Sequence, residues 1–186
     1  MYEDGIREYR DAKRKAARRF GSEKALCLGS HLPSNAEIHQ ELRRLISLYE
    51  EEVLPERLLE MRMLALKYLE LFGPFTPYLV GSVLSGVVTA SSDVDLHLFA
   101  DDVEEVEGFL DERDIPWEFE LVTVRHGGEF HDYPHLYMEE EGYLIECSVY
   151  PRSDRHNIPT SSITGRTMER ANAKRVRQII RDMMES

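Results

Sequence analysis

The sequence has few cysteines and no long hydrophobic stretch. Its 186 residues include two cysteines, Cys27 and Cys147, which are too few and too far apart for a disulfide framework or a cysteine-rich zinc site. No apolar run approaches the ~18 residues that a membrane-spanning helix needs. The N-terminal 20 residues lack the apolar stretch of a secretory signal. We therefore expect a cytoplasmic protein without a membrane segment.

The sequence also lacks internal repeats and low-complexity tracts, which argues against a solenoid or a fibrous protein. Hydrophobic residues make up 42% and charged residues 31% of the chain, a composition typical of globular proteins. The length suits one well-cored domain with a helical extension.

Negative charge dominates, but it is unevenly distributed. The net charge is −12, although residues 1–24 and residues 165–186 each carry +3. The acidic middle repels the phosphates of a long polynucleotide, so we do not expect long nucleic acid as a partner. The two basic ends either help to neutralise a small anionic substrate or are the solvated faces of helices.

The hydrophobic spacing predicts leading helices, then a mixed α/β core, then a closing helix. A capping-box pattern at Ser34–Glu37 starts one helix, and Pro55 fits the first turn of another, which stops at Gly73-Pro74. We predict an α/β (α+β) fold with a small mixed sheet. Its segments are a basic helix and linker (1–33), a helical segment (34–74), the core (75–160) and a C-terminal helix (161–186).

Apolar alternation and turn residues outline the core. We predict strands at Pro77–Val80, Val94–Phe99, Trp117–Val124, His135–Met138 and Tyr143–Tyr150, and helices at Ser82–Val87 and around Val103–Leu110. The C-terminal helix is expected to present Met168, Val176, Ile179, Ile180 and Met183 on one face.

Two aspartates open one of these strands. Alternate side chains of a strand share a face, so Asp93, Asp95 and His97 point one way while the apolar residues between them point the other. Two carboxylates two residues apart repel each other unless a cation lies between them. Hard oxygen ligands favour Mg²⁺ or Mn²⁺. The alternative is a solvated strand face with no ligand.

Gly81 and Ser82 follow a predicted strand and precede a predicted helix. Glycine permits close approach of a phosphate to the backbone, and a hydroxyl beside exposed N–H groups can bind phosphate oxygens. The same residues can equally be a turn glycine and a helix cap. Ser92, just before the aspartates, is either a phosphate contact or a turn residue.

The pattern of Gly-Ser, ten residues and then Asp-Val-Asp-Leu resembles the signature of the DNA polymerase beta-like nucleotidyltransferase superfamily. The resemblance is strongest over Phe75–Tyr150 and extends to small stand-alone bacterial members. It implies a third carboxylate on a later strand, for which Glu146 is the best match, although many relatives have Asp there. Arg166, after Thr164-Gly165, either neutralises a triphosphate or is a surface arginine.

The resemblance implies a metal-dependent enzyme that moves a nucleoside monophosphate from an NTP, with ATP the expected one, to a hydroxyl and releases pyrophosphate. Asp93, Asp95 and Glu146 would hold two Mg²⁺ or Mn²⁺ ions. The acceptor would be a small molecule or a protein, which leaves room for a homodimer or a toxin-type partner.

Other functions remain open at this point. A degenerate member of the same fold would bind a nucleotide or a partner without turnover, although the three acidic residues argue against degeneracy. An RNA end-modifying enzyme is disfavoured by the acidic body, and an interaction protein would use the helices at 34–72. His97 is expected to be a hydrogen-bonded core histidine. His126, His131 and His135 are spaced too loosely to indicate zinc.

Overall fold

The computed structural model describes residues 12–16, 32–49, 54–126, 129–158 and 167–185, together with residues 160 and 165. Residues 12–16 are helical, within the predicted segment of a basic helix and linker (1–33); residues 1–11 and 17–31 of that segment lie outside the described residues. None of the helices in these ranges combines the length and the apolar character needed to cross a membrane.

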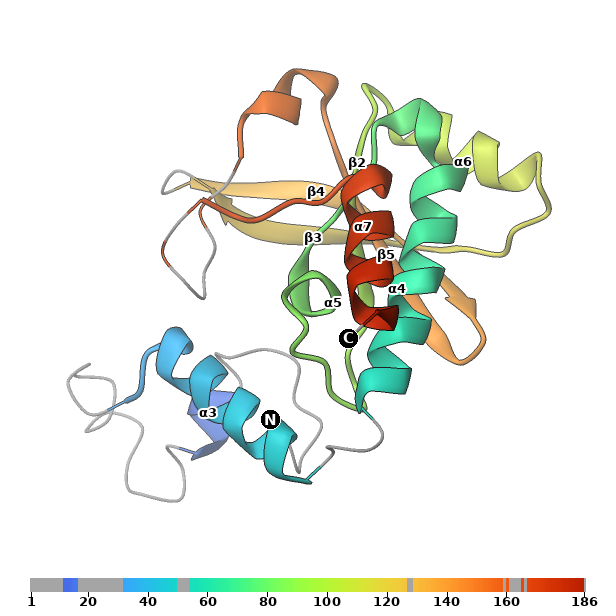
Figure 1. Cartoon of the computed structure of the whole chain (residues 1–186). Coiled ribbons are helices and arrows are strands. Elements are labelled where there is room, and N and C mark those ends of the chain that lie inside the picture. Colours follow the sequence, from blue (N-terminus) through green and yellow to red (C-terminus); the bar gives the residue numbers. More distant parts are fainter. Residues whose placement is uncertain are drawn as a thin grey trace.

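Helices come first along the chain, strands and short helices follow, and a helix closes the chain's described part (Figure 1). The helices are α3 (Asn35–Tyr49), α4 (Leu54–Leu71), α5 (Gly81–Ser85), α6 (Val103–Asp111) and α7 (Ala173–Met184). The strands are β1 (Tyr78–Leu79), β2 (Val94–Phe99), β3 (Glu118–His126), β4 (Glu129–Glu140) and β5 (Tyr143–Tyr150). Short 3-10 turns follow α4 at Gly73–Phe75 and β5 at Arg152–His156.

The strands form one mixed five-stranded sheet in the order β1-β2-β5-β4-β3. The β2–β5 pair is parallel and the other three pairs are antiparallel. The protein therefore has the mixed α+β fold that the sequence predicts, with a small sheet preceded and followed by helices.

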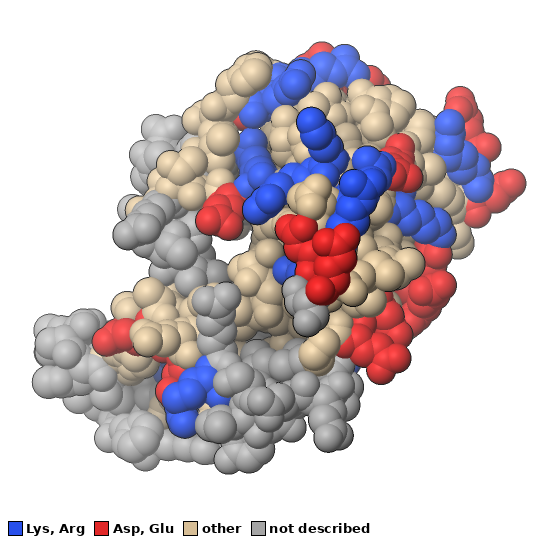
Figure 2. Space-filling model, viewed as in Figure 1, with Lys and Arg blue, Asp and Glu red and all other residues tan. Residues whose placement is uncertain are grey.

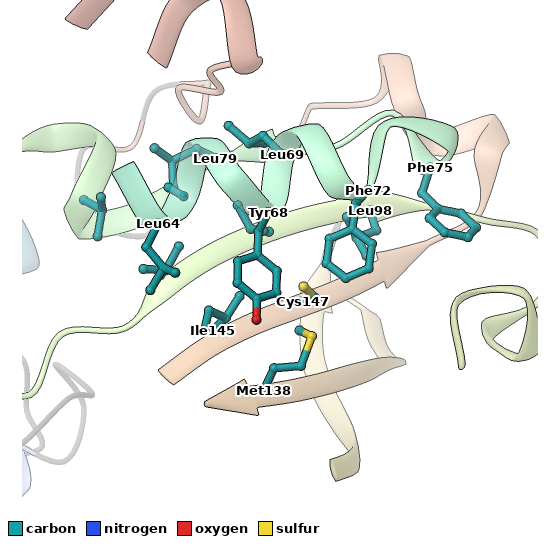
Figure 3. Close-up of a cluster of buried hydrophobic side chains, with 14 of the residues drawn as sticks. Leu64, Tyr68, Leu69, Phe72, Phe75, Leu79, Leu98, Met138, Ile145 and Cys147 are labelled. Carbon is teal, nitrogen blue, oxygen red and sulfur yellow. The ribbon is translucent and has the colours of Figure 1, made fainter. Parts of the chain in front are cut away.

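One face of the sheet packs against helices. Val94, Leu96 and Leu98 of β2 are fully buried, as are their neighbours Ile145 and Cys147 of β5. Figure 3 shows α4 lying across this face with its side chains directed at the strands. The α4 residues of this cluster are Met61, Leu64, Ala65, Tyr68 and Leu69, with Phe72 directly after the helix. Helix α4, the second helix of the predicted segment 34–74, thus shares one core with the sheet.

Helices α6 and α7 complete the same layer. Val106 and Leu110 of α6 and Val176 and Ile180 of α7 join the core cluster. The remaining exposed face of α7 is basic, and Figure 2 shows Lys and Arg atoms gathered over it (Lys174, Arg175, Arg177 and Arg181). Because α7 packs in the helical layer, these basic side chains lie on the side of the sheet away from its polar face.

Two local predictions about helix starts are confirmed. The backbone N–H of Ser34 donates to Glu37 Oε2 at 2.7 Å and the N–H of Glu37 donates to Ser34 Oγ at 3.1 Å, which is a capping box at the start of α3. Pro55 stands in the first turn of α4, where a missing N–H costs no helical hydrogen bond.

Two predicted boundaries were wrong. Strand β4 begins at Glu129 and not at His135, and its first half pairs with β3. This half is polar and contains Pro134, which lies just beyond the stretch that pairs with β5. Met168 precedes α7, because residue 171 forms a bridge with Leu79 of β1 and the helix starts only after Asn172, whose side chain caps it.

Candidate functional site

The second face of the sheet is polar, in contrast to the helix-covered face. Strand alternation assigns to it every other residue of the three central strands. These residues are Asp95 and His97 on β2, Glu146 and Ser148 on β5, and His135 and Tyr137 on β4. A polar sheet face of this kind is where a soluble protein can hold a charged ligand.

Asp95 and Glu146 are register partners on the parallel strands β2 and β5. Neighbouring strands lie about 4.8 Å apart, so the two carboxylates leave the sheet side by side. Asp93 lies just before β2, and its charge, like that of Glu146, contributes to the raised pKa of Tyr137. All three side chains are partly exposed. The sheet topology thus pairs Asp95 with Glu146, 51 positions later in the sequence, and Asp93 stands two residues before Asp95.

Gly81 faces the Asp95 carboxylate. The backbone N–H of Val80 donates to the Asp95 carbonyl at 3.0 Å, which joins the end of β1 to β2. Gly81 then has φ = +72°, and a Cβ added there would lie 2.0 Å from Asp95 Oδ2. A side chain at position 81 is therefore excluded both by the backbone angle and by the carboxylate. Ser82 follows as the second residue of α5.

Arg62 ties α5 to α4. Its side chain is buried, and its guanidinium donates to the carbonyls of Val83 at 3.1 Å and Leu84 at 3.4 Å. Burial lowers the pKa of Arg62. Because these carbonyls belong to the helix that starts at Gly81, Arg62 helps to hold the Gly81-Ser82 backbone against β2.

Ser92 belongs to a tight turn before β2. Its hydroxyl accepts a hydrogen bond from the N–H of Thr89 at 2.9 Å. Arg57 of α4 donates to the carbonyl of Ala90 in the same turn at 3.0 Å. The turn fixes the point at which the chain enters β2, and hence the position of Asp93. Arg166 lies outside the described residues.

Negative potential is concentrated at this end of the sheet. The pKa of Tyr137 rises to about 12, because of burial first and then because of the charges of Glu146, Glu120 and Asp93. The pKa of the Cys147 thiol rises well above its usual range through burial, reinforced by Glu146 and Asp95 on the other side of the sheet. Asp93 and Glu146 therefore act on the same phenol, and a cation would be favoured beside it.

His135 holds the Glu146 carboxylate. Its Nδ1 lies 2.7 Å from Glu146 Oε1. The imidazole is only 6% exposed, and its Nε2 has no hydrogen-bond partner among the described residues. The Glu146 side chain is 26% exposed, so it reaches from this buried contact toward solvent.

His97 lies on the next row of the face, away from the carboxylates. It is buried against Tyr150, with ring centres 4.8 Å apart. Burial lowers its pKa to about 3, and the charges of Arg170 and His135 add to this effect. The prediction of a core position is confirmed, but Nδ1 has no hydrogen-bond partner within the described part of the chain. Apolar and cationic neighbours keep this imidazole neutral.

A shallow pocket of about 350 Å³ lies further along the same face. It is lined by His131, Asp132, Tyr133, Pro151, Asp154 and Asn157. The carboxylates are not among its lining residues. Within the ranges that the structure describes, no three His, Cys, Asp or Glu side chains are already gathered in a metal-binding geometry.

Three residues that shape the candidate site or its surroundings were missed from the sequence. The sequence predicts His135 at the start of a strand and gives it no role in the site, although the alternation His131, Tyr133, His135, Tyr137 indicates a longer strand with these residues on one face. No sequence pattern marks Arg62, because it lies in an ordinary amphipathic helix. Arg170 lies with its guanidinium carbon 5.4 Å from the centre of the Phe99 ring, and no local pattern marked it.

A scan against protein-family models found no family that matches the chain, and a search of curated proteins found no match either. The nucleotidyltransferase resemblance therefore remains a prediction from the Gly-Ser and Asp-Val-Asp motifs. The geometry of the polar face is the observation on which a function can be built.

Proposed function

We propose that the protein is a metal-dependent nucleotidyltransferase that moves a nucleoside monophosphate from an NTP to a hydroxyl group and releases pyrophosphate. The observation that supports it most is the juxtaposition of Asp95 and Glu146 as register partners, with Asp93 two residues away and the Gly81 backbone against Asp95. Phosphoryl transfer needs this combination of acidic ligands and a close backbone approach.

The donor set fits Mg²⁺ or Mn²⁺. Asp93, Asp95 and Glu146 supply carboxylate oxygens and no soft ligand, which suits hard divalent cations. The pKa of Tyr137 is raised by burial first and then by the charges of nearby carboxylates, Glu146 and Asp93 among them, as expected where negative charge is in excess. When bound, a pair of such ions would neutralise phosphate charge and make the acceptor hydroxyl more acidic.

The chain's own residues would orient the substrates. Asp93 and Asp95 would serve both metal positions, and Glu146 would complete the second. The Gly81-Ser82 backbone would lie along the phosphates, and glycine at position 81 leaves room for the Asp95 carboxylate beside it. Ser92 would hold the turn before Asp93 and can also offer its hydroxyl to a phosphate oxygen. In the proposal, in-line attack on the α-phosphorus then follows from this positioning.

The proposed donor is ATP, and the acceptor is a small molecule or a protein side chain. Arg170, on the polar face, is the basic side chain that we add to Arg166 as a partner for anionic substrate groups. Cys147 is a free, buried thiol, as expected in a reducing compartment. We therefore propose that the reaction takes place in the cytoplasm.

One observation favours a second candidate, a module that binds nucleotide without turnover. Glu146 Oε1 is already engaged by His135 at 2.7 Å, so the third carboxylate has a structural role as well. In that case nucleotide would bind in a metal-dependent way and no pyrophosphate would be released.

The experiment is a transfer assay with the purified full chain. It is incubated with Mg²⁺ or Mn²⁺, each α-³²P-labelled NTP and a cell extract, and labelled acceptors are separated and identified by mass spectrometry. We expect a labelled acceptor together with pyrophosphate. Binding of the labelled NTP without either product would support the second candidate.

The matched control is the Asp93→Ala/Asp95→Ala double variant, whose substitutions lie on the polar face and leave the helix-covered core untouched. We expect it to fold and to label nothing above background. Equal labelling by this variant would exclude the assigned residues from the reaction.

A further inference from the structure

Glu146 is one methylene longer than aspartate, so its carboxylate has an additional freely rotating bond. A metal ligand loses affinity when it must first be ordered, because the ordering entropy opposes binding. Other groups on the sheet therefore have to hold a glutamate at this position if it is to act as a ligand.

His135 has the position and the burial to do this. It lies on β4, one row along the sheet from Tyr137, the residue directly opposite Glu146. Its Nδ1 contacts Glu146 Oε1 at 2.7 Å, a short charge-assisted hydrogen bond. An ionised carboxylate only accepts hydrogen bonds, so Nδ1 carries the proton and donates.

Among the described residues, His135 is the one side chain that a hydrogen bond joins to Glu146. Tyr137, its direct neighbour on β4, has a raised pKa because of burial first and then because of the charge of Glu146. The His135 ring is 6% exposed, which restricts its rotation, and the contact uses one of the two carboxylate oxygens. The second oxygen, Oε2, can then turn toward the register partner Asp95.

From this geometry we infer that His135 is a positioning residue that orients Glu146 as a ligand for the divalent cation. The inference rests on the proposed function, because it assigns a role inside the proposed metal site. His135 itself touches neither the metal nor the substrate. It acts through the Nδ1–H donated to Oε1, which restricts the carboxylate and leaves its other oxygen available.

The test measures binding of Mn²⁺ alone to the full chain, followed by the loss of the electron paramagnetic resonance signal of free Mn²⁺. His135→Leu removes the donor at similar size, whereas His135→Asn keeps an N–H group at the position of Nδ1. We expect Mn²⁺ affinity to fall about 10- to 100-fold in the Leu variant and to stay within a few-fold of wild type in the Asn variant. A merely structural role would not distinguish the two variants in this way if both fold.

A second measurement keeps the inference testable if His135→Leu does not fold. Two-bond ¹H–¹⁵N correlation spectra of the unsubstituted protein report which ring nitrogen of His135 is protonated. We expect the ring to carry its proton on Nδ1. An Nε2–H tautomer in the unsubstituted protein would overturn the inference.

The outcomes separate the two proposals. If the unsubstituted protein binds no Mn²⁺, the proposed function fails and the role of His135 fails with it. If it binds Mn²⁺ and His135→Leu binds equally well, the positioning role alone is overturned and the proposed function stands.

Discussion

The two faces of β2 and β5 are built from alternating residues of the same strands, yet one face is apolar and buried and the other carries partly exposed carboxylates. On one face Leu96 and Cys147 are completely buried under α4, and on the other Asp95 and Glu146 remain partly exposed. Like carboxylates placed side by side do not stabilise a fold. Burial of the apolar face offsets the charge repulsion on the polar face. Substitutions on the apolar face should therefore change stability, and substitutions on the polar face should change metal binding and activity.

The largest separation is expected between the neighbours Asp95 and Leu96. Asp95→Asn removes a negative charge from a repulsive pair, so we expect unchanged or slightly higher thermal stability. NTP-dependent transfer should fall by at least about 10²- to 10³-fold, the range seen when one preorganised electrostatic group is removed. Thermal unfolding and the transfer assay check the two halves.

Leu96→Ala should show the reverse. Truncating a fully buried leucine costs about 2–5 kcal/mol of unfolding free energy, measured by urea denaturation. The folded fraction should still bind Mn²⁺ with the affinity of the unsubstituted protein. A variant that keeps its stability but loses Mn²⁺ binding would contradict the division of the sheet into two faces.

Gly81→Ala should lower both stability and Mn²⁺ affinity. The new Cβ would lie 2.0 Å from Asp95 Oδ2, at a residue whose φ is +72°. We expect a stability loss of about 1–2 kcal/mol from the left-handed backbone and at least a ~10-fold weaker Mn²⁺ affinity. Gly86→Ala is the matched control: its φ is +79°, but its nearest neighbour is Arg62 Nη2 at 3.4 Å. Gly86→Ala should lose similar stability and keep the Mn²⁺ affinity of the unsubstituted protein. Equal losses of Mn²⁺ affinity in the two variants would show that backbone strain, and not the contact with Asp95, is the cause.

Arg62 connects the helical layer to the backbone at Gly81. Arg62→Met leaves the carbonyls of Val83 and Leu84 without their charged donor, so we expect a loss of about 1–3 kcal/mol in thermal or urea unfolding. Arg62→Lys retains a charged donor and should lose less. If the Met variant is as stable as the unsubstituted protein, the carbonyls find other donors and α5 does not depend on Arg62.

The last prediction concerns pH, and its effect is small near neutral pH and grows as the pH falls. The pKa of His97 falls from its usual 6.5 to about 3 in the folded protein, so below pH 6.5 the unfolded chain binds a proton that the folded chain rejects. His97 therefore favours folding fully above pH 6.5, and this contribution is lost as the pH falls toward 3, by up to about 1.4 kcal/mol per pH unit. In EDTA, urea unfolding of His97→Gln should depend less steeply on pH between 6.5 and 4 than that of the unsubstituted protein. Identical slopes would mean that the folded protein protonates His97 freely.

Local pattern was sufficient for much of the fold. Strand β2 has the predicted bounds Val94–Phe99, because apolar and polar residues alternate from Val94 to Leu98. The same alternation on β5 separates Glu146 from Ile145 and Cys147, so the sides of both strands could be predicted without knowing their pairing.

The pairing of β2 with β5 could not be predicted, and it decides the rest of the candidate site. The alignment of Asp95 with Glu146 depends on β2 and β5 being parallel neighbours, which no residue between them specifies. The His135 contact depends in addition on the extension of β4, whose first half is held by its partner β3 and not by its own hydrophobic pattern. Long-range contacts of this kind are invisible to a local reading.

The central claim is that the three carboxylates converge on divalent cations, and anomalous diffraction measures this most directly. Crystals of the full chain would be soaked with Mn²⁺ and a non-hydrolysable ATP analogue, and data collected near the manganese edge. The account predicts anomalous peaks about 2.1 Å from carboxylate oxygens of Asp93, Asp95 and Glu146, with the phosphates beside Gly81. Peaks confined to other parts of the surface, or phosphates bound away from β2, would contradict it.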